Sequence, residues 1–190
     1  VRVWLVSDRE GAELGVFHFD PFARPGKRSG AWMNTYRVQT TKDGARVPPI
    51  VLNTCNFMRP SEGEPATLTM DEARTLFHEF GHAMHGLASA VPYRSLAGTA
   101  VPRDFVEFPS QLNEHWLTTS ALVERFARDV ETDAPLPAAL LERVKAASNA
   151  DSGFRTMELL ASAVVDMMLH LADDVPDPDA FEAQVLEEWG

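Results

Sequence analysis

Two histidines and a glutamate occur within five consecutive residues of this chain. Residues 78–82 read HEFGH, an H-E-x-x-H motif. Residues four positions apart share one face of an α-helix, so His78 and His82 can both direct a ring nitrogen at one metal ion. Glu79 lies about 100° around the helix, beside the ion, where a carboxylate can take a proton from an attacking water. The spacing predicts a hydrolytic zinc site; the alternative is a helix with two ordinary surface or core histidines.

The surrounding segment has the pattern of an amphipathic helix. Apolar residues recur at spacings of three and four through positions 73–87, and Thr69 or Asp71 can cap the start. We therefore predict a helix over 69–88. Gly81 lies in its interior, where glycine costs about 1 kcal/mol relative to alanine. A glycine there allows another backbone to approach closely, either at a substrate cleft or simply from a neighbouring packed element.

A third metal ligand is expected downstream, because catalytic zinc usually keeps three protein ligands. Glu107 follows His82 by 25 positions, enough for the first helix to end and a second one to pack across it. Asp104 and Glu107 also have the spacing of a capping box, which is the alternative for this pair. Pro109 cannot donate a backbone hydrogen bond, so a helix start or a kink is expected close to Glu107.

Three further residues are candidates for roles around the metal. Asp104 and Ser110 lie three positions on either side of Glu107, and either could accept a ring N–H from a metal-bound histidine. For Asp104, helix capping is the alternative. His85 follows His82 by three positions and shares its face. It could replace Glu107 as a ligand, support the site or contact substrate, or be a polar residue at the helix edge.

These residues resemble the thimet oligopeptidase family of zinc metallopeptidases. The similarity covers most of the chain, and Phe108 with the run 111–116 is more similar to the peptidyl-dipeptidase (dipeptidyl carboxypeptidase) branch than to the endo-oligopeptidase branch. The motifs that carry the resemblance are HEFGHAMH at 78–85, Gly98-Thr99, RDFVE at 103–107 and PSQ at 109–111.

The resemblance implies a zincin-like metallopeptidase core. It implies His78, His82 and Glu107 as ligands of one zinc ion per chain, with Glu79 as the catalytic base. The implied substrates are short peptides, from whose free C-termini dipeptides would be released. The alternatives are an endo-acting oligopeptidase of the same family and a fragment that binds zinc or peptide without turnover. The ligand set would also accept cobalt or manganese.

Members of that family are several times longer and carry a tyrosine-rich segment downstream that helps to bind substrate. The tyrosines of this chain are Tyr36 and Tyr93, so we interpret residues 1–190 as a single catalytic-core fragment without the N- and C-terminal parts of the full enzyme. Activity of the chain alone is then an open question. We expect an α+β, predominantly helical fold, with a β-rich part over 1–58 and a helical part over 67–190 that carries the zinc site.

Composition limits the partners. The net charge of −11, without a basic stripe, argues against nucleic acid. Cys55 is the one cysteine, so an internal disulfide is excluded, and its apolar neighbourhood predicts a buried side chain. No apolar segment is long enough to span a membrane and no signal segment is evident, so we expect a cytoplasmic protein. The sequence leaves the oligomeric state open.

The remaining elements are predicted from turn signals and periodicity. A loop in the middle of the β-rich part contains the run GAWM at 30–33 and lies either near the cleft or merely at the surface. A strand or hairpin beside the metal helix is expected to pair with the substrate backbone. The predicted elements are a hairpin over 1–20, a loop over 21–48 and a strand over 48–53. Three helices are predicted after these, the first over 136–150, the second from Gly153 to residue 171, and the third over 178–189.

Overall fold

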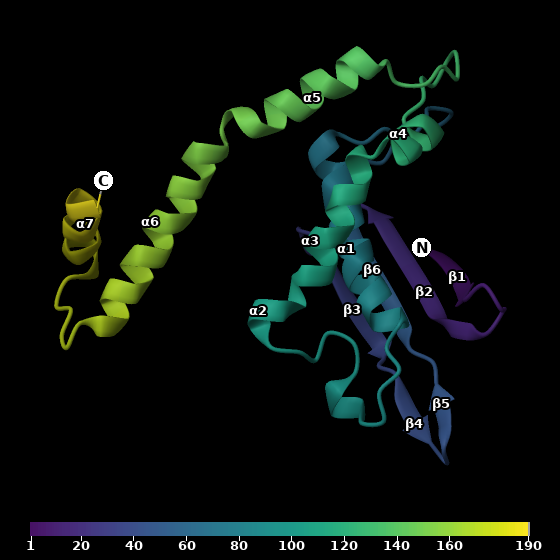
Figure 1. Cartoon of the computed structure of the whole chain (residues 1–190), viewed down its shortest axis with the longest axis horizontal. Helices are drawn as coiled ribbons and strands as arrows, with labels where there is room; N and C mark the ends of the chain where they lie inside the picture. The colour runs from purple at the N-terminus through teal and green to yellow at the C-terminus, as the bar shows by residue number, and fades with distance from the viewer. Residues whose placement is uncertain (190) are drawn as a thin grey trace. The chain divides into compact units, whose positions relative to one another are not determined.

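The structure, a computed structural model, describes residues 1–189, apart from the side chains of residues 148 and 149. The chain divides into two compact units, Val1–Pro135 and Leu136–Gly190, and each is described by itself. Strands occupy the first part of the chain and helices the rest (Figure 1). The expected α+β, predominantly helical fold is confirmed.

The first unit contains a four-stranded mixed sheet with the order β1-β2-β6-β3. The central strands β2 and β6 are parallel, and the edge strands β1 and β3 run antiparallel to their neighbours. The predicted hairpin over 1–20 is confirmed as β1 and β2. The bounds of the four strands are Arg2–Ser7 for β1, Glu13–Phe22 for β2, Trp32–Arg37 for β3 and Ile50–Phe57 for β6.

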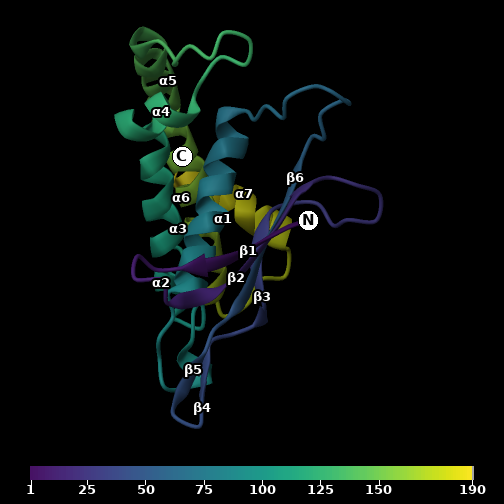
Figure 2. The ribbon, with the colours of Figure 1, turned by 90° about the vertical axis from the view of Figure 1, so that its right-hand side faces the viewer.

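The prediction of a loop over 21–48 is wrong, because this segment contains strand β3 and a second hairpin. That hairpin joins β4 (Thr40–Lys42) to β5 (Ala45–Val47) and projects beyond the end of the four-stranded sheet in both views (Figures 1 and 2). Arg46 attaches it to the rest of the unit, since its guanidinium donates hydrogen bonds of 3.0–3.1 Å to the backbone carbonyls of Leu87 and Ser89.

The metal-motif helix α1 spans Met70–Leu87, which confirms the predicted helix over 69–88. Thr69 caps it: its hydroxyl accepts from the backbone N–H of Glu72 at 3.1 Å, and the Glu72 carboxylate accepts from the Thr69 N–H at 2.8 Å. The helix packs across the sheet. Its buried residues Ala83 and Leu87 form the core together with Phe17 and Val51 from β2 and β6.

Short helices follow α1 and return across it. The 3₁₀ turn η1 (Arg94–Leu96) precedes α2 (Arg103–Val106) and α3 (Phe108–Glu114), which flank Glu107. The chain then continues through η2 (His115–Thr118) and α4 (Ser120–Phe126). Helix α3 lies against α1 (Figure 1), where the Asn113 amide donates a 2.7 Å hydrogen bond to the carbonyl of Phe77.

Gly81 is the point of closest approach between these two helices. A Cβ atom at this position would lie 2.6 Å from the Cα of Ser110 and 2.8 Å from the carbonyl oxygen of Pro109. The glycine is therefore required by close packing of a neighbouring element, one of the two explanations that the sequence offered. That packing sets how near α3, and with it Glu107, comes to the histidines of α1.

We expect Gly81→Ala to lower the free energy of unfolding, because overpacking usually costs about 1–3 kcal/mol. The gain of about 1 kcal/mol from better helix propensity offsets part of this cost, so the net decrease should be at most about 2 kcal/mol. Urea denaturation would measure the change. Gly153→Ala is the matched control, because nothing lies within 4 Å of a Cβ there and only the propensity gain applies. A Gly81→Ala chain that gains as much stability as the Gly153→Ala control would contradict the close α1–α3 contact.

The second unit consists of α5 (Ala138–Ala150), α6 (Ser152–Leu171) and α7 (Pro178–Trp189). The predicted helices over 136–150 and 178–189 are confirmed. The break before the long helix lies at Asp151 rather than at Gly153, which belongs to the first turn of α6. Within the described residues, none of the helices is apolar over a stretch long enough to cross a membrane.

Candidate metal centre

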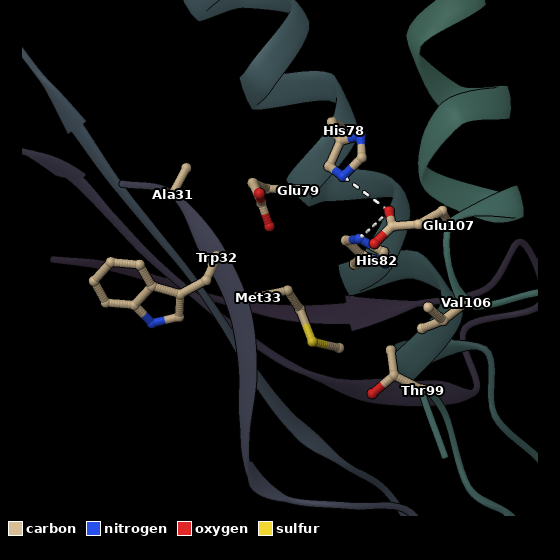
Figure 3. Close-up of a pocket in the computed structure, with 9 residues that line it drawn as sticks. All are labelled: Ala31, Trp32, Met33, His78, Glu79, His82, Thr99, Val106 and Glu107. Atoms are coloured by element: carbon tan, nitrogen blue, oxygen red, sulfur yellow. Dashed lines mark ion pairs between the residues drawn. The ribbon is translucent and has the colours of Figure 1, made fainter. Parts of the chain in front are cut away.

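Three side chains converge between α1 and the junction of α2 and α3 (Figure 3). The Nε2 atoms of His78 and His82 lie 3.2 and 3.1 Å from Oε2 of Glu107, and one donor atom from each residue lies within 4.8 Å of the others. Tetrahedral zinc with bonds of about 2.0–2.1 Å keeps neighbouring ligand atoms roughly 3.3 Å apart. The donor set and its spacing therefore fit a zinc ion bound by two histidines and one glutamate.

Local structure explains this convergence. His78 and His82 are one turn apart on α1, so their rings emerge from the same face. Glu107 is the residue that ends α2 and precedes α3, with φ −83° and ψ −11°. Pro109 stands in the first turn of α3, where its missing N–H costs no helical hydrogen bond. The helix start expected near Glu107 is confirmed, and it directs this carboxylate toward the histidines.

Glu114, which is not among the residues predicted from the sequence, orients the His78 ring. Its Oε1 lies 2.7 Å from Nδ1 of the ring, so a proton on Nδ1 is donated to the carboxylate and the lone pair of Nε2 is left for a metal. Arg74 Nε lies 4.0 Å from the second oxygen of Glu114. The sequence signal that could have indicated Glu114 is its spacing from Glu107. The two residues are seven positions apart, about two helical turns, so they lie on the same side of α3.

The expectation that Asp104 or Ser110 accepts a ring N–H from a metal-binding histidine is wrong. Ser110 is fully buried and donates instead to Glu107, at 2.8 Å to its carbonyl oxygen and 2.9 Å to Oε2. Asp104 is exposed in the first turn of α2. The capping box of Asp104 and Glu107 is also wrong, because the N-cap is Pro102 and no side chain caps this short helix.

The charges around the cluster suit metal binding. Burial raises the pKa of Glu107, but the Ser110 hydroxyl and the two nearby histidines outweigh this and lower the pKa below its usual value. Burial lowers the pKa of His82, and Glu107 opposes that shift only in part. An ionised carboxylate and a neutral imidazole are the protonation states in which these groups can bind a metal.

Glu79 lies beside the cluster, on the side of β3 (Figure 3). Its side chain is buried, with the residue 7% exposed, and Oε2 has no hydrogen-bond partner among the described groups. Burial raises the pKa of Glu79 most strongly; His78 and a backbone hydrogen bond from Met33 lower it, while Glu107 raises it further. A desolvated carboxylate with a raised pKa is a stronger base than an exposed one.

A cleft of about 500 Å³ opens over these groups. One wall is the start of β3 with the residue before it, which places the GAWM run near the cleft rather than at an unrelated surface. The opposite rim comes from the segment after α1 and from α2. The lining residues are Ala31, Trp32, Met33, His78, Glu79, His82, Thr99, Val106 and Glu107 (Figure 3).

Two other residues discussed in the sequence, His85 and Cys55, lie outside the cluster. His85 packs against Phe105, with ring centroids 6.3 Å apart, and its buried Nδ1 has no hydrogen-bond partner within the described part of the chain. Burial lowers the pKa of His85. Cys55 is fully buried as expected, and burial raises the pKa of its thiol to about 12, so the thiol remains protonated.

A helix that presents an H-E-x-x-H face over a small sheet, opposite a further glutamate, is typical of metal-dependent peptidases. Comparison with known proteins specifies the class. Residues 1–189 match Peptidase family M3, and the chain belongs to this family, whose members are metal-dependent. The resemblance noted in the sequence is thereby confirmed.

Similar proteins include two bacterial dipeptidyl carboxypeptidases. That of Salmonella typhimurium is 45% identical over 174 residues, covering 92% of this chain and 25% of the relative. That of Escherichia coli is 43% identical over 189 residues, covering 98% of this chain and 28% of the relative. Oligopeptidase A of Escherichia coli is 37% identical over 190 residues, covering 99% of this chain and 28% of the relative. The chain therefore spans about a quarter of the length of these relatives.

Proposed function

We propose that this chain is the catalytic core of a zinc-dependent peptidase that hydrolyses short peptides and releases dipeptides from their free C-termini. The observation that carries the proposal is the convergence of His78, His82 and Glu107 within 4.8 Å, with the buried carboxylate of Glu79 beside them. His78, His82 and Glu107 would hold the zinc ion. When bound, the ion supplies a Lewis acid that polarises the scissile carbonyl and acidifies water.

Glu79 performs the proton transfers in this proposal. Its carboxylate takes a proton from the water whose oxygen attacks the scissile carbonyl carbon. It then gives that proton to the leaving nitrogen as the C–N bond breaks, so the residue is restored for the next turnover. Burial suits the first step, since a raised pKa makes the carboxylate a better base, and the proton taken up there is the one that Glu79 later donates.

The substrate backbone is proposed to align with β3. The strand predicted over 48–53 corresponds to β6, which is paired on both sides with β2 and β3 and has no free edge. That site for substrate pairing is therefore excluded. Among the described residues, strand β3 pairs only with β6, and its first residues line the cleft. An extended peptide added to this edge would pass in front of Glu79.

Release of dipeptides is favoured over internal cleavage by the higher identity to the two dipeptidyl carboxypeptidases, 45% and 43%, than to oligopeptidase A, 37%. The endo-acting alternative keeps the same metal site and the same role for Glu79. A pair of peptides separates the two. A dipeptide-releasing enzyme cleaves the peptide with a free C-terminus and spares its amidated twin, whereas an endopeptidase cleaves both.

The direct test is the metal content of the purified chain, measured by elemental mass spectrometry and followed by assay with that peptide pair. About one zinc per chain together with cleavage supports the proposal. Zinc without any cleavage of short peptides would favour the fragment that binds zinc without turnover. Absence of metal after zinc is supplied would contradict the assignment of the three ligands.

Glu114→Gln is expected to weaken zinc binding by about 10- to 100-fold, the usual effect of removing a carboxylate that orients a metal-binding histidine. The amide keeps the size of the side chain but loses the charge that favours a proton on Nδ1 of His78. Zinc affinity measured by competition with a chelating dye would show the change. Glu124→Gln, a carboxylate of α4 outside the site, is the control. An unchanged affinity in Glu114→Gln would remove Glu114 from the site.

A further inference from the structure

The segment 23–31 connects β2 to the wall of the cleft, and one buried ammonium group organises it. Residues 23–30 are exposed at every position except Lys27, whose side chain is only 5% exposed. The segment ends at Ala31 and continues into Trp32 and Met33, and these three residues line the cleft. Its conformation therefore determines where the wall of the cleft begins.

The Lys27 ammonium is surrounded by oxygen atoms from both central strands. Nζ donates to the carbonyl oxygens of Asp20 at 3.0 Å and Phe22 at 2.8 Å, and to that of Cys55 on β6. The Asp20 carboxylate lies 3.3 Å from the same nitrogen and balances its charge. A buried ammonium with all these partners satisfies its three N–H donors, so the interaction holds the loop instead of destabilising it.

A second contact holds the end of the loop. The Asn56 amide on β6 donates to the carbonyl oxygens of Arg28 at 2.8 Å and Gly30 at 2.7 Å. Gly30 has φ +95°, a left-handed conformation that favours glycine and turns the chain into β3. Lys27 and Asn56 thus attach the middle and the end of the loop to β6, the strand that pairs with β3.

From these contacts we infer that Lys27 is a positioning residue for substrate binding. Its ammonium fixes the 23–31 loop on β2 and β6 and thereby sets the position of Ala31–Met33 at the edge where the peptide backbone is proposed to align. The inference rests on the proposed function for its effect on substrate. The contacts described for the Lys27 ammonium are with Asp20, Phe22 and Cys55, and none of these is a proposed metal ligand. Lys27 should therefore affect peptide binding and not metal binding.

The test compares Lys27→Met with Arg24→Met in the whole chain. Arg24 pairs with the same Asp20 carboxylate at 2.7 Å, but its side chain is 49% exposed and it is not one of the residues that line the cleft. We expect Lys27→Met to raise KM for a short peptide about tenfold, with kcat and zinc affinity changed less than about twofold. Arg24→Met should leave all three quantities near their wild-type values. An unchanged KM in Lys27→Met would overturn the inference.

Hydrogen exchange makes the result independent of the proposed function. Backbone amides of residues 28–34 should exchange faster in Lys27→Met than in Arg24→Met, while those in the middle of α1 stay protected. Unchanged protection of 28–34 would overturn the inference even in a chain that cleaves no peptide. If Lys27→Met does not fold, Asn56→Ala removes the second contact, and the same faster exchange and higher KM are expected. Wild-type behaviour in that variant would count against the inference.

Discussion

Glu79→Gln is expected to abolish peptide hydrolysis while the chain keeps its metal. The amide has the size of the carboxylate but cannot accept the water proton, so the rate should fall by about 10²- to 10⁴-fold, the usual contribution of a general base. Zinc affinity should hold, because Glu79 is not one of the three converging ligand residues. The measurement is kcat/KM on a short peptide with a free C-terminus, with metal content determined on the same sample.

Asp71→Asn is the matched control for this variant. It makes the same change from carboxylate to amide on the same helix, but the Asp71 side chain is 93% exposed, so activity should be retained. Glu79→Gln should fold as well as the wild type, since it removes a desolvated charge with one oxygen that has no hydrogen-bond partner among the described groups. Normal turnover by Glu79→Gln with a full complement of zinc would show that the proton-transfer role is wrong.

The part of the site that could be predicted from sequence is the part that depends on local geometry. His78, Glu79 and His82 take their relative positions from one helix, and that helix is set by its own periodicity and cap. Glu107 could be predicted as a ligand from the family resemblance and from the spacing of its motif. Glu114 was not selected, because its contact with His78 depends on how α3 lies on α1, and the sequence does not give that register.

The strands show the same limit. The hairpin of β1 and β2 is local, and it was predicted. The wall of the cleft was not, because β3 joins the sheet by pairing with β6, a strand that is separated from it in sequence by the β4–β5 hairpin. The composition of 21–48, rich in proline, glycine, lysine and arginine, indicates a loop. The structural role of Lys27 becomes visible only when β2 and β6 are placed side by side.

Glu107→Ala is expected to weaken zinc binding by at least about 100-fold, since loss of a ligand should exceed the 10- to 100-fold cost of losing an outer partner. The imidazoles of His78 and His82 would remain as neutral donors on one helix face. The negative charge of the Glu107 carboxylate, which favours binding of a dication, would be lost. The hydroxyl of Ser110 would also lose its partner at Oε2, but it keeps the backbone carbonyl at 2.8 Å as an acceptor. Folding should therefore be largely unaffected, and zinc titration with a competing chelator measures the affinity.

Asp104→Ala is the control, because it removes a carboxylate from the neighbouring turn without touching the converging donor atoms. The remaining alternative is His85, which lies one turn beyond His82. Adding His85→Ala to Glu107→Ala tests whether His85 acts as a substitute ligand. Packing of His85 against Phe105 predicts that the second substitution changes zinc affinity little. A chain that keeps wild-type zinc affinity after Glu107→Ala but loses it in the double variant would assign the third ligand to His85.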